Sequence, residues 1–174
     1  MRPPGEGERV SEYPGRLGEA IDVLSFATDP ADRADLLLSF ADRFREVPPE
    51  IARRPFPEIS RVPSCESEAF AWGVLQDDGT LKLHFAVENP SGVSAKALAA
   101  ILDRSLSGLP PAEAARVSPD IVYEIFRRDI SMGKGLGLMS MVRAVQVIAR
   151  QAAEAAAPGG AGPCVFPRQP GTPR

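Results

Sequence analysis

Residues 69–88 read AFAWGVLQDDGTLKLHFAVE, and this stretch decides the fold. Bulky apolar residues occupy every second position over 70–74, and apolar residues occupy every second position over 81–87. Such alternation is typical of β-strands, and the Asp77-Asp78-Gly79 sequence between the two runs is a turn signal whose glycine can adopt a positive φ. The stretch therefore predicts an antiparallel hairpin with one apolar face.

On both sides of the hairpin the apolar residues recur three or four positions apart, which is the spacing of an amphipathic helix. The five apolar stripes begin at Leu17, Leu37, Leu98, Val122 and Leu138. Before the second stripe, Asp29 and Pro30 predict a helix cap, and Arg33 falls on the face left for solvent. This order of elements predicts an α+β fold, a small antiparallel β-sheet with helices packed on one face.

The two ends of the chain differ in composition from the part between them. Residues 1–14 combine prolines, glycines and charges without apolar periodicity, and residues 158–174 are rich in proline and glycine. Such segments bury too little apolar surface to offset the entropy of ordering. The sequence therefore predicts a flexible segment over 1–14, one folded domain over 15–157 and a disordered tail over 158–174.

Composition excludes several functional classes. The 20 basic and 23 acidic residues give a net charge of −3, so we expect no nucleic-acid partner, which would call for a clustered basic surplus. Without an apolar run of about 20 residues or a signal-peptide core, we expect a soluble, cytoplasmic protein with no membrane partner. Two cysteines and one histidine can form neither a disulfide framework nor a Cys/His zinc cage.

Few residues could carry chemistry. His84, the single histidine, lies on the polar side of the second predicted strand and is interpreted as a surface residue. The glycine-rich stretch 133–137 lacks the spacing of a phosphate-binding loop and is interpreted as a flexible loop before the last helix. Cys164 lies in the proline-rich tail and is interpreted as incidental.

Cys65 has a different setting, between a proline-rich loop and the first strand, with Ser64, Glu66 and Ser67 around it. A cysteine that fills a core more often lies within an apolar stripe, whereas a loop can present this one. A thiolate here could attack an activated sulfur without a neighbouring histidine, although Glu66 and Glu68 disfavour the thiolate. The residues alone leave open whether Cys65 is a nucleophile or an ordinary loop cysteine.

An ordered series of motifs resembles the SufE family, sulfur acceptors that work with pyridoxal-phosphate-dependent cysteine desulfurases in iron–sulfur cluster assembly. The motifs are Asp29-Pro30 with Arg33, Arg61-Val62-x-x-Cys65-x-Ser67, Asp78-Gly79, Leu83-His84-Phe85, Lys96-Ala97-Leu98 and Gly137-Leu138-x-x-Met141. The resemblance covers most of residues 17–152. It implies a SufE/IscU-like fold, which agrees with the α+β class predicted from the periodicities.

The resemblance also implies a function. Cys65 stands at the position of the cysteine in the family's Gly-Cys-Gln-Ser loop, which carries sulfur as a persulfide. The residues that the resemblance places at the partner interface are Arg61, Ser64, Glu66, Ser67 and Lys134. The protein would be an accessory sulfur carrier and not a stand-alone enzyme. It would need no cofactor or metal, because pyridoxal phosphate belongs to the SufS-type desulfurase, and a downstream Fe–S scaffold would receive the sulfur.

The sequence departs from the family pattern on both sides of the cysteine and at two other positions. Ser64 replaces the usual glycine, and Glu66 replaces the usual glutamine. Ser91 stands where an acidic residue is usual, and Lys134 is the best match for a basic residue that is typically arginine, whose bidentate contact a lysine cannot reproduce. These departures keep open an alternative function, a SufE-like interaction module that binds and regulates a desulfurase without accepting sulfur.

Overall fold

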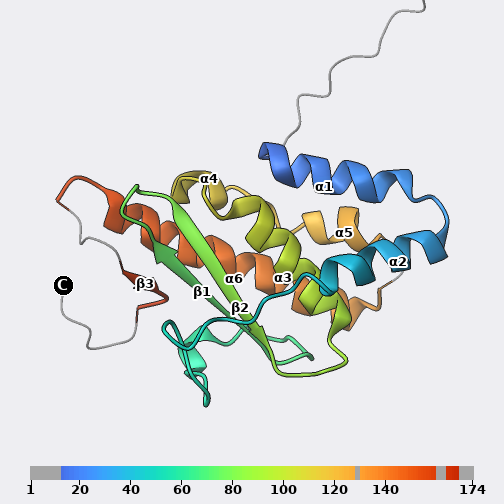
Figure 1. Ribbon diagram of the computed structural model, residues 1–174, viewed down its shortest axis with the longest axis horizontal. Helices are drawn as coiled ribbons and strands as arrows, with labels where there is room; N and C mark the ends of the chain where they lie inside the picture. The colour runs from blue at the N-terminus through green and yellow to red at the C-terminus, as the bar shows by residue number, and fades with distance from the viewer. Residues whose placement is uncertain (1–12, 128–129, 160–163, 169–174) are drawn as a thin grey trace, which may run out of the picture.

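A computed structural model describes residues 13–127, 130–159 and 164–168, and expectations for the other residues lie outside the described part. The helices are α1 (Gly15–Phe26), α2 (Pro30–Ala41), the 3₁₀ helix η1 (Glu58–Ser60), α3 (Val93–Leu106), α4 (Pro111–Ala114), α5 (Ile121–Phe126) and α6 (Met132–Ala156). The strands are β1 (Ala69–Leu75), β2 (Leu81–Val87) and β3 (Val165–Phe166). Figure 1 shows α1, α2 and α5 together at one end of the molecule and β3 at the other. The predicted α+β class is confirmed.

The antiparallel sheet has the strand order β2-β1-β3, and its register corrects one detail of the predicted hairpin. Trp72 pairs with His84, whereas Ala71 pairs with Phe85. Because residues directly opposite each other project from the same face, the bulky residues of β1 share a face with the polar residues of β2. The apolar residues of the two strands therefore face opposite sides of the sheet, and the hairpin has two buried faces.

The small residues of β1 lie on the face that α6 covers. A Cβ atom on Gly73 would collide with Cγ2 of Ile148 in α6, so the close packing of helix and strand requires glycine here. On the same face Leu83 and Phe85 are almost completely buried. The main core lies between this face and the helices, and the predicted apolar stripe of α6 is buried in it.

The other face of the sheet is covered by the proline-bearing loop that follows α2. Phe70 and Trp72 are buried there, and Phe56 from the loop packs against both, with ring centroids 5.2 Å apart in each case. The loop also runs along the edge of β2, where the amide of Val47 donates to the carbonyl of Phe85 at 2.8 Å. A segment predicted only as a loop thus covers the face of the sheet that α6 does not cover.

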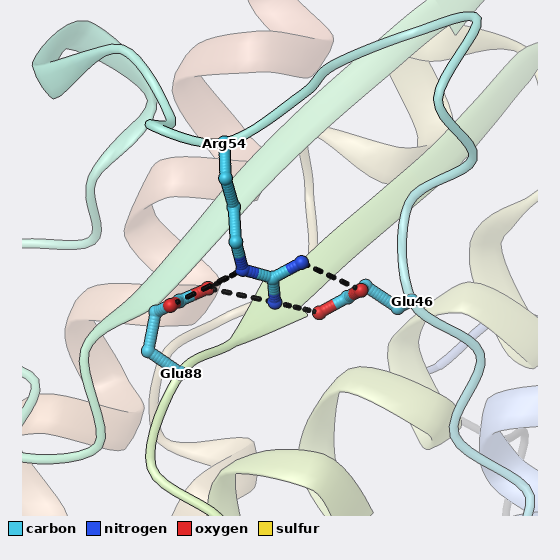
Figure 2. A network of polar contacts seen from close by, with 3 residues as sticks. All are labelled: Glu46, Arg54 and Glu88. Atoms are coloured by element: carbon cyan, nitrogen blue, oxygen red, sulfur yellow. Dashed lines mark hydrogen bonds and ion pairs between the residues drawn. The ribbon is translucent and has the colours of Figure 1, made fainter.

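One arginine fastens this loop to the sheet (Figure 2). Arg54 donates from Nε to Oε1 of Glu88 at 3.0 Å and from Nη1 to Oε2 of Glu46 at 3.1 Å. The hydrogen bonds to Glu46 and then to Glu88 raise the pKa of Arg54 above its ordinary value. The guanidinium also lies 4.8 Å from the ring centroid of Phe56. Because the network is exposed to solvent, it fixes the path of the loop more than it adds to stability.

Arg33 is buried, with 3% of its surface exposed, which corrects its prediction as a solvent-facing residue. Its guanidinium donates to the carbonyls of Glu124 and Ile125 at 2.7 and 2.6 Å, and also to the carbonyl of Leu24. These carbonyls lie in the last turns of α5 and α1, where helices leave acceptors without an internal partner. Arg33 lies four positions before Leu37 and seven before Phe40, so it shares the helix face of the apolar stripe, and this face packs against the two helix ends.

The expected disorder of residues 158–174 is corrected for the described residues 164–168. Val165 and Phe166 pair with Val74 and Gly73 of β1, and Phe166 is fully buried in the main core. Two apolar residues between prolines are too few to show a periodicity, so no sequence pattern predicted this strand. Among the described residues, no helix has both the length and the apolar character that crossing a membrane requires.

Candidate functional site

Cys65 lies in a tight loop between η1 and β1. Two residues of this loop have positive φ without being glycine, namely Ser64 at 57° and Glu68 at 49°. The amide of Glu68 donates to the carbonyl of Cys65 at 3.1 Å and closes the turn. The Cys65 side chain is half-buried and packs against the margin of the main core, so the loop presents the thiol while holding its backbone in place.

The first two turns of α6 pack against this loop. The stretch 133–137, expected to be a flexible loop, is helical, and Ser131 caps the helix by accepting from the amide of Lys134 at 3.3 Å. A Cβ atom on Gly137 would lie 2.8 Å from the carbonyl oxygen of Ser64 and 3.2 Å from Cα of Cys65. Glycine is a poor helix former, and its presence here lets the helix touch the backbone of the loop.

A small pocket of about 90 Å³ opens beside Cys65. The pocket is lined by Cys65, Glu66, Ser67, Ser91, Gly92, Val93, Ser94, Ala95, Lys134, Gly137 and Leu138. These residues come from the cysteine loop, from the N-terminal end of α3 with the residues before it, and from the first turns of α6. The lining combines hydroxyl groups, one ammonium and one carboxylate with apolar atoms, so the site can hold a small polarisable or anionic group.

The structure gathers four of the six predicted site residues in this pocket and leaves two outside its lining. Cys65, Glu66, Ser67 and Lys134 line it together. Ser64 is exposed and borders the pocket only through its backbone at Gly137.

Arg61 belongs to a different surface. Its Nε donates to Oε2 of Glu58 at 2.9 Å, and its guanidinium lies 5.1 Å from the ring centroid of Phe70. The bond to Glu58 raises the pKa of Arg61 above its ordinary value. Arg61 lines a second, more apolar groove of about 380 Å³ with Ile59, Val147 and other residues of η1 and α6. That groove adjoins the cysteine loop through Pro63.

Acid–base groups near Cys65 are few. His84 does not line the pocket, and burial, followed by repulsion from Lys82, lowers the pKa of His84 below its ordinary value. Among the described residues, no three side chains of histidine, cysteine, aspartate or glutamate are arranged to hold a metal ion. The chemistry that this arrangement supports is attack by sulfur on an already activated partner, which depends on alignment more than on proton transfer.

Cys164 is also ordered, contrary to its interpretation as an incidental tail residue. It immediately precedes β3, its carbonyl accepts from the amide of Leu75 at 3.0 Å, and its side chain is half-buried. Nη2 of Arg168 lies 3.7 Å from its sulfur.

Sequence reasoning missed two features of the site: the contact of Gly137 with the loop and the serines that line the pocket at the start of α3. Three glycines within one apolar-periodic stretch were the available signal for the first. Glycines inside a helical pattern mark a close approach as readily as they mark a loop.

Comparison with known proteins agrees with this architecture. The family model described as "SufE: Fe-S metabolism associated domain" matches residues 18–149. SufE-like protein 1, chloroplastic/mitochondrial, from Arabidopsis thaliana is 21% identical over 143 residues, which are 82% of this chain but only 37% of that protein.

A solution structure of a hypothetical protein from Thermus thermophilus has the same fold, with a TM-score of 0.63 and 24% identity, and the match covers 80% of this chain and 97% of that one. The family match spans most of the chain and includes the cysteine loop, the hairpin and most of α6. The chain therefore belongs to the SufE family of Fe–S-metabolism-associated domains.

Proposed function

We propose that this protein accepts sulfur on Cys65 from a pyridoxal-phosphate-dependent cysteine desulfurase of the SufS type and carries it as a persulfide towards Fe–S cluster assembly. The observation that carries the proposal is the position of Cys65, half-buried on a rigid loop beside a pocket of about 90 Å³. A water-sized group needs only about 15 Å³ of such space, so one additional sulfur atom fits.

The proposed step is a thiol–persulfide exchange. The thiolate of Cys65 attacks the outer sulfur of the persulfide on the desulfurase's cysteine, and a new S–S bond forms as the partner's S–S bond breaks. The partner's cysteine leaves as a thiolate, and the proton of the outer sulfur stays on that sulfur. No external oxidant or reductant is needed, because the transferred sulfur keeps its oxidation state.

The pocket lining suits the product. After the new persulfide releases its proton to solvent, the resulting anion is attracted by the ammonium of Lys134, and the hydroxyls of Ser67 and Ser94 can donate to it. The carboxylate of Glu66 lies over the first turn of α6, where a Cβ atom on Gly133 would lie 3.3 Å from its Oε1. The positive end of the helix dipole partly offsets the charge of that carboxylate.

The same proposal assigns different tasks to this protein and to the desulfurase. The partner supplies pyridoxal phosphate and releases sulfur from free cysteine, whereas this chain supplies a second thiol and protects its load, as an accessory protein and not a stand-alone enzyme. A downstream Fe–S scaffold then receives the sulfur. A reducing compartment such as the cytoplasm suits this role, because Cys65 must be a free thiol to accept sulfur.

A second candidate function is a regulatory module that binds a desulfurase without taking its sulfur. It is favoured by Ser64, which holds a positive φ that glycine adopts at lower cost, and by the negative charge of Glu66 next to the thiol. Both features weaken sulfur acceptance and leave a docking surface intact.

The experiment that tests the proposal is intact-mass analysis after incubation with a desulfurase, pyridoxal phosphate and cysteine. We expect one added sulfur that a reductant removes, present in Cys164→Ser and missing in Cys65→Ser. Binding and stimulation of the desulfurase are measured on the same variants. If wild-type protein stimulates but never gains sulfur, and Cys65→Ser stimulates equally, the regulatory module is the correct function.

A further inference from the structure

A third pocket, of about 330 Å³, lies between α2, α3 and β2. It is lined by Arg16, Phe40, Arg43, Phe44, Arg45, Lys82, Phe85, Ala99, Ala100, Asp103, Arg104 and Ser107. Its residues on α3 begin at position 99, whereas the pocket beside Cys65 uses positions 93–95. The two linings share no residue, and their nearest members on α3, Ala95 and Ala99, are four positions or about 6 Å apart along the helix axis.

The charge of this pocket is strongly one-sided. Arg16, Arg43, Arg45 and Arg104 are all exposed around it, in a chain whose net charge is −3. The carboxylate in the lining is already neutralised, because Asp103 forms an ion pair with Lys82 and accepts a hydrogen bond from Ser107 at 2.6 Å. The pocket therefore presents an uncompensated positive surface.

Hydrogen bonding within the fold does not neutralise the charges of these arginines, since Arg16 donates to a backbone carbonyl, that of Arg104, at 3.4 Å. Within the described residues, none of the four forms an ion pair with a carboxylate. Arg43 and Arg104 lie near the C-terminal ends of α2 and α3, where a cation interacts well with the helix dipole, but Arg16 lies at the start of α1 and Arg45 in a loop. Four like charges around one pocket repel one another, which a bound anion would relieve.

The floor of the pocket is apolar, since Phe40, Phe44 and Phe85 with two alanines of α3 form it. Arg43 lies over the ring of Phe40, 5.9 Å from its centroid. We infer that this pocket is a docking site for a partner protein's acidic segment that carries an apolar side chain. The apolar side chain enters the floor, and flanking aspartates or glutamates meet the arginine rim, which is the usual anatomy of a protein–protein interface.

A small phosphate-bearing ligand fits these observations less well. Phosphate sites commonly use helix N-termini, whose amides and positive dipole hold the anion. Here the C-terminal halves of α2 and α3 border the pocket, and the negative ends of their helix dipoles have the opposite sign. Exposed, flexible arginines are better suited to carboxylates that arrive on a partner's surface.

The test uses the ¹⁵N-labelled full chain with Cys65→Ser, so that sulfur chemistry plays no part in the result. The probe is a peptide of alternating aspartate and glutamate with one central phenylalanine. We expect saturable amide shifts at Ala99, Ala100 and Ser107, with little change at Ser67. The binding should weaken as salt is added, because the rim contacts are exposed ion pairs.

Two double variants of equal charge decide the assignment. Arg43→Glu with Arg104→Glu should weaken peptide binding roughly tenfold, since two rim contacts become repulsive. Arg116→Glu with Arg150→Glu, exposed arginines outside the pocket lining, should change it less than about twofold. Replacing the peptide's phenylalanine by alanine should also weaken binding. Equal effects of the two double variants, scattered shifts, or tighter binding of tripolyphosphate than of the peptide would overturn the inference.

Discussion

The two segments that carry the cysteines are buried to a similar extent, but different contacts hold them in place. Cys65 and Cys164 are both half-buried at the margin of the main core, and each precedes a strand of the same sheet. The loop of Cys65 contacts the backbone at Gly137, whereas the segment of Cys164 is held by pairing with β1 and by one buried ring, that of Phe166.

The difference lies in what surrounds each sulfur. Cys65 opens into a pocket with Lys134 and several serines, whereas the sulfur of Cys164 lies beside an exposed arginine, Arg168. The exposure of the two side chains therefore does not distinguish the two cysteines. The arrangement of neighbouring groups is the physical basis for assigning sulfur chemistry to Cys65, and the supports of the two segments can be removed one at a time.

The largest effect is expected from removing the anchor of the Cys164 segment. Phe166→Ala removes a fully buried ring and should lower the free energy of unfolding by about 3 kcal/mol or more. Val165→Ala, which shortens a partly exposed side chain of the same strand, is the matched control and should cost much less. Urea denaturation of both variants measures the difference. Equal stabilities would show that β3 does not pack on β1.

The next effect is expected at Gly137, which supports the Cys65 segment. Gly137→Ala places a methyl group 2.8 Å from the carbonyl oxygen of Ser64, so the loop must move, at a cost of about 1–3 kcal/mol. We expect the rate of Cys65 alkylation by iodoacetamide to change several-fold and sulfur acceptance to fall, while Cys164 reacts at an unchanged rate.

The matched control for that variant is Gly135→Ala in the same helix. There the added methyl group would meet only the flexible end of Ile130, at 3.3 Å, and alanine has the higher helix propensity. This variant should be neutral or more stable and should leave Cys65 unaffected. If the two alanine variants behave alike, the contact between helix and loop does not position Cys65.

The two segments also differ in how far they could be predicted from sequence. Local periodicity predicted the hairpin, the helices other than α4, η1 and the first turns of α6, and the α+β class, because each signal is contained within one element. It did not predict which faces of the two strands pair, since register depends on the turn and on α6 packing over Gly73. It also missed β3 and the burial of Arg33, which are created by distant parts of the chain.

For the candidate site, the resemblance to a family brought together residues that no single pattern connects. Cys65 and Lys134 are 69 positions apart in the sequence and line one pocket. Arg61 lies close to Cys65 in sequence but faces another groove, because its guanidinium is held by Glu58 and Phe70. Closeness in sequence therefore predicted the lining of the pocket less well than the family resemblance did.

A smaller effect is expected from the backbone strain beside Cys65. Ser64 has a φ of 57°, a conformation that costs an ordinary residue roughly 1 kcal/mol or more relative to glycine. Ser64→Gly should therefore stabilise the protein by up to about 1 kcal/mol, less the entropy that glycine adds to the unfolded chain. Ser67→Gly, at a position without positive φ, should destabilise it instead. Thermal unfolding of both variants measures this, and equal shifts would exclude strain at Ser64.

The smallest effect is expected at Glu66, where two influences oppose each other. Its carboxylate lies over the first turn of α6, so Glu66→Gln should cost a few tenths of a kcal/mol of stability through the helix dipole. The same change removes a negative charge next to the sulfur. Cys65 should then react roughly twofold faster with a negatively charged disulfide reagent at low salt, and less so at high salt.

Neutral iodoacetamide and Cys164 provide the two controls for that variant. The rate with iodoacetamide should change less than the rate with the charged reagent, because only the latter is repelled by the carboxylate. Cys164, which lies outside the pocket that contains Glu66, should keep its rate with both reagents. A faster reaction of Cys65 that is equal for both reagents and insensitive to salt would mean that Glu66 acts by shaping the loop. In that case the glutamate at this family position affects sulfur acceptance through access to the thiol, and its charge does not.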